Sequence, residues 1–253
     1  MGSAISAEML AGYADKVRLV SAVDAEDSPL SGKTVHGTDV LVLTPSGLEE
    51  ALKNADCCIN FSLPEAEVES VPEIVSAGKN VVLATTGFTE EQFKKIEDAV
   101  ESSEASMLYA PNFSPLVNVQ LHLAKIAVEK LALLGYDFGV VEEHHTRKKD
   151  APSGTAKKLL GNVSSSGGGE RIVFRNEGSG PWKKGDLDAA VFRLGGTPGQ
   201  HELRIVGKHG RMVLETLMYS RADFAKGAIE GALWLRENGE PGKIYGMEDV
   251  LKL

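Results

Sequence analysis

The 253-residue sequence has no apolar run that approaches the roughly 20 residues needed to span a membrane, and it shows no signal peptide. It is also poor in cysteine: the only two, Cys57 and Cys58, are adjacent in the apolar run at 57–61. Such a pair indicates buried strand thiols in a reducing compartment, and neither a disulfide framework nor a metal site. We therefore expect a cytoplasmic protein with no membrane association and no bound metal.

The sequence contains fewer basic than acidic residues. Lys and Arg number 27 against 36 Asp and Glu, so the formal net charge is −9. A nucleic-acid-binding protein would favour a basic surface, so the sequence predicts no nucleic-acid partner. Any anion that the protein binds must then be met by local positive charge.

The first half alternates short apolar runs with segments of helical spacing. We expect strands at 17–23, 40–43, 57–61, 80–84 and 106–110, and helices at 5–12, 48–53, 64–77 and 90–102. This alternation predicts βαβ units and a mainly parallel sheet, in which ligands bind beyond the carboxyl ends of the strands. Asp24, Phe61, Thr85-Thr86 and Asn112-Phe113 follow strands, so they should line one edge.

The second half has a different character. We expect helices at 116–134, 153–163 and 224–237, strands at 137–141, 171–174, 189–193, 202–206 and 211–219, and a hairpin turn at 207–210. The segment 164–169, rich in Ser and Gly, is typical of a flexible loop. Mixed strands with few helices suggest a separate α+β domain, and the last helix could pack back on the first domain.

The stretch 142–156 gathers groups that suit one small anionic substrate. The adjacent histidines His144 and His145 point in opposite directions on an extended chain, so one can face a site while the other packs. A single histidine at a strand end is most often structural. Histidine is nevertheless the side chain best placed to donate a proton near neutral pH, and Lys148 adds a compact positive charge.

The end of this stretch predicts an anion-binding helix start. Pro152 blocks a helix before Ser153, and Ser153 can cap the helix that follows. The N–H groups of Gly154 and Thr155 would then be unpaired, and Gly154 would let an anion approach closely. A carboxylate is the natural ligand for such a site.

Asp24 and two polar turns suggest a nicotinamide cofactor. An acid after the second strand binds the adenosine ribose in dinucleotide folds, although such a residue is more often part of a turn. Ala25 follows it, so no adjacent arginine is available for a 2′-phosphate, which favours NADH or the use of both NADH and NADPH. Taken singly, each of the turns at 85–88 and 111–114 is typical of an ordinary connection between a strand and a helix. Two such turns at the same sheet edge suit a nicotinamide pocket better than either does alone.

One string of residues is far more specific. It reads His144-His145-x-x-Lys148-x-Asp150-Ala151-Pro152-Ser153-Gly154-Thr155 and resembles the signature of the 4-hydroxy-tetrahydrodipicolinate reductase family, also called dihydrodipicolinate reductases. The resemblance covers nearly the whole chain. It includes the turns at 85–88 and 112–114, Val117-Asn118-Val119, and the segment 224–228.

The resemblance implies an α/β enzyme of two domains. Residues 1–114 and 223–253 would form a Rossmann-like, parallel-sheet dinucleotide-binding domain. Residues 115–222 would form an α+β domain with a mixed sheet, which binds substrate and builds a homotetramer. The implied reaction passes a hydride from NADH or NADPH to 4-hydroxy-tetrahydrodipicolinate, a small cyclic dicarboxylate, and yields tetrahydrodipicolinate for diaminopimelate and lysine biosynthesis.

Roles follow from the resemblance residue by residue. His144 would be the general acid and Lys148 its catalytic partner. The substrate carboxylates would be bound by His145, Ser153, Gly154 and Thr155. The cofactor would be bound by Gly2, Asp24, Phe61, Ala84, Thr85, Thr86, Ala110, Pro111, Asn112 and Phe113.

The beginning of the chain departs from the family pattern. Family members open with a strand that runs into a G-x-x-G-R-M-G loop, whereas Met1-Gly2 matches only the tail of that loop. We expect that an internal methionine is treated as the start, so that the first strand and most of the pyrophosphate-binding glycines are lacking.

Two other functions compete with the reductase. One is a catalytically silent dicarboxylate-binding or scaffold homologue that has lost the cofactor cradle. The other is a nicotinamide enzyme of the homoserine or aspartate-semialdehyde type. The second is less favoured, because the paired-histidine string is not the pattern of those enzymes and no suitably placed cysteine nucleophile is present.

Overall fold

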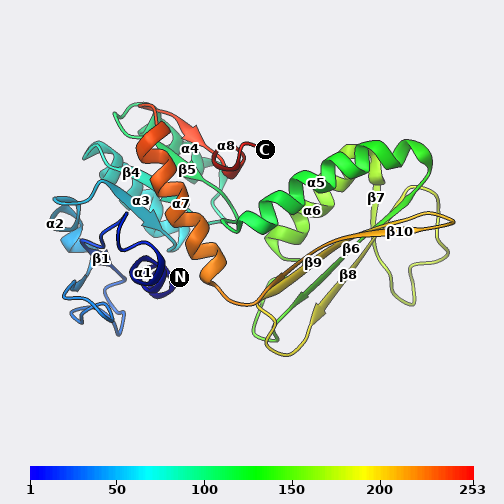
Figure 1. Ribbon diagram of the computed structural model, residues 1–253, viewed down its shortest axis with the longest axis horizontal. Helices are drawn as coiled ribbons and strands as arrows, with labels where there is room; N and C mark the ends of the chain where they lie inside the picture. Colours follow the sequence, from blue (N-terminus) through cyan, green and yellow to red (C-terminus); the bar gives the residue numbers. More distant parts are fainter. The chain divides into compact units, whose positions relative to one another are not determined.

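The computed structural model describes all 253 residues and divides the chain into two compact units. The first contains Met1–Ser114 and Ala222–Lys252, and the second contains Pro115–Arg221 (Figure 1). No helix in either unit is both long enough and apolar enough to cross a membrane.

A four-stranded parallel sheet forms the centre of the first unit. Its order is β11-β5-β4-β3, with β3 at Cys57–Asn60, β4 at Asn80–Leu83, β5 at Met107–Tyr109 and β11 at Ile244–Tyr245. Side chains alternate across the sheet, and both faces are covered. Val81 and Leu83 pack in the core with α3 (Pro64–Ser76) and α4 (Glu90–Glu101), whereas Val82 packs in the core with α7 (Ala222–Asn238) and α8 (Met247–Leu251). This is the doubly wound arrangement that the sequence predicts.

Two strands of the first unit lie outside this sheet. β1 (Ala22–Val23) and β2 (Val42–Leu43) pair in parallel as a sheet of their own. The strand expected at 17–23 forms only at its last two residues. In this small sheet β1 has a partner on one side only. β3 is likewise an edge strand, and all four of its residues are partly exposed. Cys57 and Cys58 are free cysteines on this strand, partly exposed as residues, and they pack against the core clusters on the two faces of the sheet. Burial raises the pKa of both thiols.

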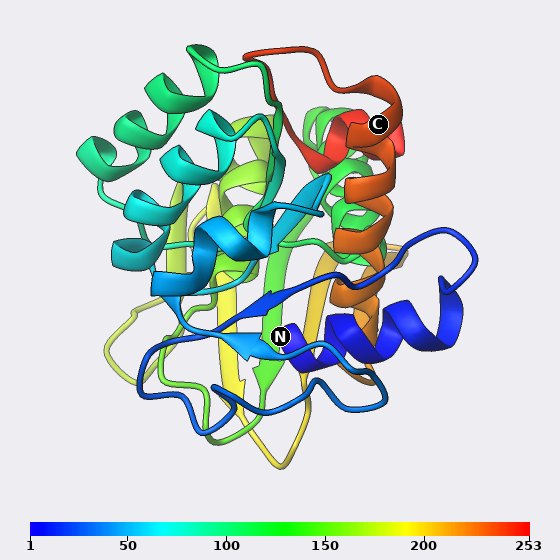
Figure 2. The same ribbon diagram turned by 90° about the vertical axis from the view of Figure 1, so that its left-hand side faces the viewer.

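Helix α1 (Gly2–Gly12) packs against α7 (Figure 2). Ile5 and Tyr13 share a buried cluster with Ala225 and Ile229, and the Tyr13 hydroxyl donates a hydrogen bond to Glu230 over 2.6 Å. The short helix α2 (Leu48–Leu52) follows a turn of 3-10 helix at Pro45–Gly47. The N-terminus of α4 carries a capping box, in which Thr89 and Gln92 each accept the other's backbone N–H.

The second unit holds a five-stranded mixed sheet of order β10-β9-β6-β8-β7. The strands are β6 (Asp137–His144), β7 (Arg171–Phe174), β8 (Asp186–Arg193), β9 (Gly199–Val206) and β10 (Arg211–Met218). β6 runs parallel to β8 and antiparallel to β9. β6 continues three residues beyond its expected end, and His144 therefore lies on a strand in the middle of the sheet.

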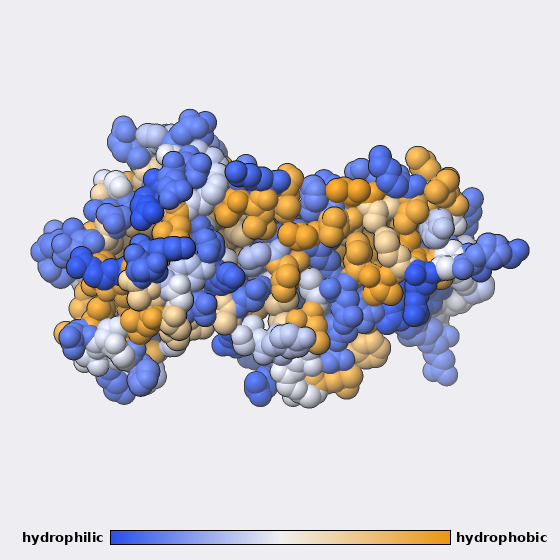
Figure 3. Space-filling model, in the orientation of Figure 1, coloured by the Kyte–Doolittle hydropathy of each residue, from blue (hydrophilic) through white to orange (hydrophobic).

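Two helices, α5 (Pro115–Leu131) and α6 (Gly154–Val163), cover one face of this sheet (Figure 1). The alternate residues of β6, from Phe138 to His144, are buried on one side of the strand. The outer side of α5 remains exposed, and apolar side chains gather there (Figure 3). They are Leu116, Val119, Leu123 and Ile126.

The segment 164–169 is not the flexible loop expected from its composition. A π-type turn at Ser164–Gly168 continues α6, and the backbone kinks at Gly167, where φ is 92°. A Cβ at Gly168 would lie 2.5 Å from Val163 and 2.9 Å from Val128. Gly168 is therefore required for close packing against α5, since no larger residue fits.

Candidate active site

A buried carboxylate and imidazole lie side by side near the end of β6. Glu142 and His144 are two residues apart, so they share one face of the strand, and they are 0% and 7% exposed. Nδ1 of His144 lies 2.9 Å from Oε1 of Glu142, and Nη1 of Arg193 lies 2.9 Å from the same oxygen. Both are ion-pair distances, although neither contact is aligned as a hydrogen bond.

The start of α6 is joined to this pair through Ser153. Its backbone N–H donates to Oε2 of Glu142 over 2.8 Å, and its hydroxyl accepts from the N–H of Ala156 over 3.1 Å. Ser153 is therefore the helix cap that the sequence predicts. The same hydroxyl lies 3.1 Å from Nε2 of His201, whose ring meets that of His144 edge to face with centroids 5.2 Å apart.

Charge is distributed asymmetrically in this cluster. Burial alone would raise the pKa of Glu142, but the contacts with His144 and with the N–H of Ser153 outweigh it and lower that pKa to about 2. Burial, reinforced by the neighbouring His144, lowers the pKa of His201 to about 4. The network thus keeps an ionised carboxylate beside His144 and a neutral imidazole behind it.

The loop after β6 holds the remaining basic groups. Lys148 is 23% exposed and lies 2.8 Å from Asp150, and its N–H donates to the carbonyl of His145 over 3.1 Å. His145 donates its own N–H to Thr197 over 2.8 Å. Desolvation, followed by the charge of Arg147, lowers the pKa of His145. Arg193 donates to the carbonyl of Asp150 over 2.5 Å and closes the loop.

Small residues leave room at two points of the cluster. Gly199 on β9 lies against the imidazole of His144, and a Cβ there would be 3.0 Å from Nε2. Gly154 opens α6, where amide groups have no carbonyl partner within the helix, and a Cβ there would meet no atom within 4 Å. Open space therefore lies beside Gly154 at the start of the helix.

A metal ion is a second possible use of the cluster. Glu142, His144 and His201 present ligand atoms within 4.8 Å of one another. However, one carboxylate oxygen already faces Arg193, and the other accepts the N–H of Ser153. A cation would compete with a fixed guanidinium, so we interpret the group as a proton-handling network.

The second unit thus brings the six predicted catalytic and substrate-binding residues into one segment, although their contacts differ. His144, His145, Lys148, Gly154 and Thr155 lie around the loop and the helix start. Ser153 is 3% exposed, and its hydroxyl is engaged within the protein.

The first unit collects most of the predicted cofactor residues at the carboxyl ends of its strands. Asp24 follows β1 and is exposed, and its carboxylate accepts from the N–H of Ala25 and the hydroxyl of Ser28. Thr86 and Pro111 are exposed in the turns after β4 and β5. Gly2 is exposed at the start of α1.

Other members of the set face inward. Phe113 is 1% exposed and packs against Phe61 with centroids 6.0 Å apart. Thr85 is buried, and its hydroxyl donates to Glu67 over 3.0 Å. Ala84 and Ala110 donate their N–H groups to strand carbonyls. Asn112 accepts the N–H of Ser114.

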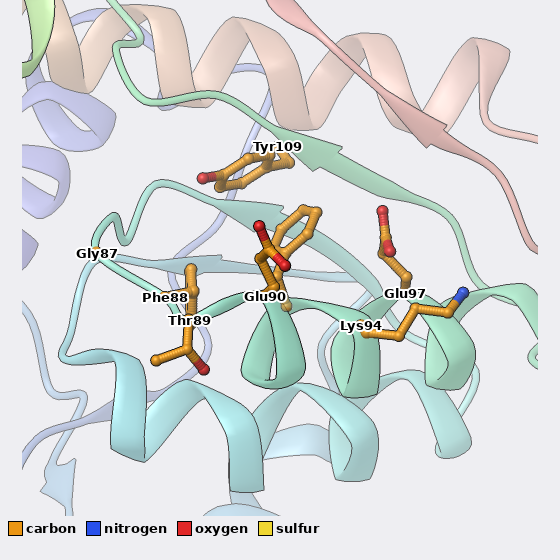
Figure 4. A pocket seen from close by; sticks show the side chains of 8 residues that line it. Gly87, Phe88, Thr89, Glu90, Lys94, Glu97 and Tyr109 are labelled. Carbon is orange, nitrogen blue, oxygen red and sulfur yellow. The ribbon is translucent and has the colours of Figure 1, made fainter.

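An open hollow of about 550 Å³ lies at the start of α4 (Figure 4). Phe93 lies between Phe88 and Tyr109 there, with centroid distances of 5.9 and 4.6 Å, and burial raises the pKa of Tyr109. None of the predicted cofactor residues lines this hollow. Gly87 and Phe88 do line it, so the hollow borders the predicted turn at 85–88.

Sequence reasoning missed several residues of the cluster. Glu142 could have been found from its strand spacing to His144. Arg193, Gly199 and His201 lie on β8 and β9, and only the pairing of those strands with β6 brings them to His144.

The chain was compared with known proteins. The family model described as "Dihydrodipicolinate reductase, N-terminus" matches residues 1–113, and "Dihydrodipicolinate reductase, C-terminus" matches residues 117–251. The 4-hydroxy-tetrahydrodipicolinate reductase of Methanopyrus kandleri is 34% identical over 244 residues, which are 94% of this chain and 88% of that protein. The enzyme of the same name from Aquifex aeolicus is 38% identical over 209 residues, which are 82% of this chain and 77% of that protein.

The fold is also found in a solved structure. Dihydrodipicolinate reductase from Paenisporosarcina sp. TG-14, solved with bound dipicolinate, superposes with a TM-score of 0.76 at 21% identity. The match covers 98% of this chain and 94% of that one. Since both family models match and together cover nearly all of the sequence, the chain belongs to the dihydrodipicolinate reductase family.

Proposed function

We propose that this protein is an NAD(P)H-dependent reductase that converts 4-hydroxy-tetrahydrodipicolinate to tetrahydrodipicolinate in diaminopimelate and lysine biosynthesis. Its family and its similarity to named reductases over most of the chain support this activity. One structural observation carries the assignment of the site: His144 lies beside an ionised carboxylate that also accepts the backbone N–H of Ser153, the cap of α6.

His144 is the proposed general acid. Its Nδ1 is enclosed and faces Glu142, which leaves Nε2 as the nitrogen that can reach a bound ring. The nearby carboxylate fixes the orientation of the imidazole. The proton passed to the substrate would come from Nε2.

The substrate carboxylates are the proposed ligands of the helix start. Gly154 and Thr155 occupy the first turn of α6, where the amide N–H groups and the helix dipole favour an anion. Lys148 contributes a positive charge from the loop, and the imidazole of His145 offers ring nitrogens for hydrogen bonds. Ser153 contributes through its position as the cap, because its hydroxyl is already engaged.

The cofactor is the proposed ligand of the strand ends in the first unit. The residues there fit a nicotinamide dinucleotide: an exposed carboxylate at Asp24 suits two ribose hydroxyls, and the exposed turns after β4 and β5 present backbone groups. When bound, NADH or NADPH would supply the hydride. With Ala25 next to Asp24, no adjacent arginine is available for a 2′-phosphate, which favours NADH or the use of both cofactors.

The assembly and location are part of the proposal. The face of the second unit's sheet opposite α5 and α6 exposes apolar side chains, which are Phe192, Val206, Val213 and Leu217. Such a face supports a homotetramer built through this sheet. The two free thiols, together with the biosynthetic role, support a cytoplasmic location.

The test is direct. Purified protein is mixed with enzymatically generated 4-hydroxy-tetrahydrodipicolinate and either NADH or NADPH, and cofactor oxidation is followed at 340 nm. We expect turnover that pyridine-2,6-dicarboxylate inhibits competitively, and none with aspartate semialdehyde. If the protein binds pyridine-2,6-dicarboxylate but never oxidises either cofactor, it is a silent dicarboxylate-binding homologue and the proposal is wrong.

A further inference from the structure

Glu67, in the first turn of α3, is a buried carboxylate that the proposed reaction does not use. It is 1% exposed, and its five hydrogen-bond donors are all uncharged. A buried carboxylate is costly unless its oxygens are fully hydrogen-bonded. The five donors offset that cost, and they tie the carboxylate to several segments of the chain at once.

The donors come from two strand ends and from α3 itself. From the end of β3, Asn60 donates its side-chain amide over 2.6 Å, and Ser62 donates its N–H over 3.1 Å and its hydroxyl over 2.7 Å. From the end of β4, Thr85 donates its hydroxyl over 3.0 Å. Ser70 donates over 3.2 Å from the next turn of the helix. One carboxylate thus joins the segments that follow two adjacent parallel strands.

These segments are the predicted cofactor turns. Phe61 lies between Asn60 and Ser62, and Thr85 belongs to the turn after β4. A further hydrogen bond, from the N–H of Ser62 to the hydroxyl of Thr85 over 3.1 Å, joins the two turns directly. Because the hydroxyl of Thr85 points at Glu67, it is engaged within the protein, whereas the next residue, Thr86, is exposed.

We propose that Glu67 is a positioning residue for the nicotinamide cofactor: it fixes the turns after β3 and β4 relative to each other, so that their backbone groups are preorganised to receive the cofactor. This inference rests on the proposed function, which places the cofactor at this edge. Glu67 does not touch the cofactor; it acts through Ser62 and Thr85.

The substitution Glu67→Gln keeps the size of the side chain and replaces one acceptor oxygen by a donor. In one orientation its amide would face the amide of Asn60, and in the other it would face the N–H of Ser62. Either way at least one donor loses its partner. We expect Kd for NADH, followed by nucleotide fluorescence, to rise about tenfold, as for a lost hydrogen bond to a charged group. KM for the dicarboxylate and kcat at saturating NADH should change less than about twofold, because the second unit is unaltered.

Two further variants make the test specific. Glu65→Gln changes an exposed carboxylate in the same first turn of α3 and should bind NADH like the wild type. The double variant Asn60→Asp with Glu67→Gln exchanges carboxylate and amide across their 2.6 Å contact, so the new amide can donate to the new carboxylate while the other oxygen still accepts from Ser62 and Thr85. The hydroxyl of Ser70, which donates to the replaced oxygen, can turn and accept instead. The double variant should recover most of the lost NADH affinity.

The inference fails if folded Glu67→Gln binds NADH as tightly as the wild type, or if it weakens NADH and dicarboxylate binding equally along with a lower Tm. If Glu67→Gln does not fold, Thr85→Val removes one donor at constant shape and must itself weaken NADH binding. A wild-type protein that neither binds nor oxidises NADH or NADPH would instead overturn the proposed function, and this inference with it. If the wild type turns over and the Glu67 variants bind NADH as tightly as it does, only this inference is wrong.

Discussion

Nδ1 of His144 lies 2.9 Å from Oε1 of Glu142, two residues earlier on the same buried face of β6. Oε2 of the same carboxylate accepts the N–H of Ser153, the cap of α6. One side chain therefore holds both the proposed proton donor and the cap of the helix that carries the proposed carboxylate site. The four predictions that follow test the residues around this connection and at the cofactor edge.

Substituting His144 should remove general-acid catalysis without affecting the cofactor. For His144→Gln we expect kcat to fall by about 10²- to 10⁴-fold, the usual contribution of a positioned acid. Kd for NADH should stay within about twofold of the wild type, since the predicted cofactor residues lie in the other unit. Steady-state kinetics and nucleotide fluorescence measure the two quantities. The exposed His209, in the turn after β9, is a matched control as His209→Gln; normal turnover by His144→Gln would disprove its role.

Lys148 and Lys149 form a natural pair for testing the positive charge. Lys148 is partly buried against Asp150, whereas Lys149 is exposed. Lys148→Met should lower kcat/KM for the dicarboxylate at least about tenfold, because it removes a cation near the anion site. Lys149→Met should have little effect, since an exposed charge is well solvated. Equal effects of the two substitutions would show that only the net charge of the loop matters.

Glu142 should make the free energy of unfolding depend on pH in the acidic range. Its pKa is lowered to about 2 from an ordinary value of 4.5, so its ionised form stabilises the folded protein fully above about pH 4.5. That contribution, roughly 3 kcal/mol, is lost as the pH falls from 4.5 towards 2. We expect Glu142→Gln to be much less stable than the wild type at pH 6, and the gap to narrow at pH 3. Urea unfolding at several pH values measures the gap, and a constant gap would contradict the assignment.

Asp24 should control the choice of cofactor. Its exposed carboxylate can accept ribose hydroxyls and would repel a 2′-phosphate. For Asp24→Asn we expect kcat/KM with NADH to fall about tenfold, and the ratio of NADPH to NADH efficiency to rise. Asp27→Asn, at an exposed position in the same loop, serves as the control. An unchanged ratio in Asp24→Asn would mean that the ribose lies elsewhere.

Much of the fold could be predicted because the signals are local. Alternating apolar runs and helical spacing predict the two sheets, and Pro152 and Ser153 predict the start of α6, because strand pleat and helix capping depend on neighbouring residues. The strand β11 and the helix α8 were not expected. β11 has only two residues and depends on its pairing with β5.

The ends of strands were harder to predict where polar residues continue the pairing with neighbouring strands. β6, β8 and β9 each extend three residues into polar sequence at Glu142–His144, Asp186–Asp188 and Gly199–His201. Hydrophobic periodicity does not mark such residues as strand, because their side chains satisfy one another inside the protein instead of packing as apolar groups. Two of these three extensions contribute to the candidate active site.

The candidate site was predictable where a motif is contiguous and not where it is assembled by pairing. The segment from His144 to Thr155 is visible in the sequence, but Arg193 and His201 reach it only through the register of β8 and β9. Glu67 went unnoticed for the same reason, since its partners belong to two different strand ends.

Gly199 gives the His144 imidazole its room, and this has a consequence for how the protein tolerates change. A methyl group at position 199 would lie 3.0 Å from Nε2, so the ring that faces Glu142 would have to give way by a few tenths of an ångström. Position 199 therefore constrains the proposed acid although it carries no side chain. Laboratory evolution of this reductase should find position 199 less variable than the exposed positions of the same hairpin.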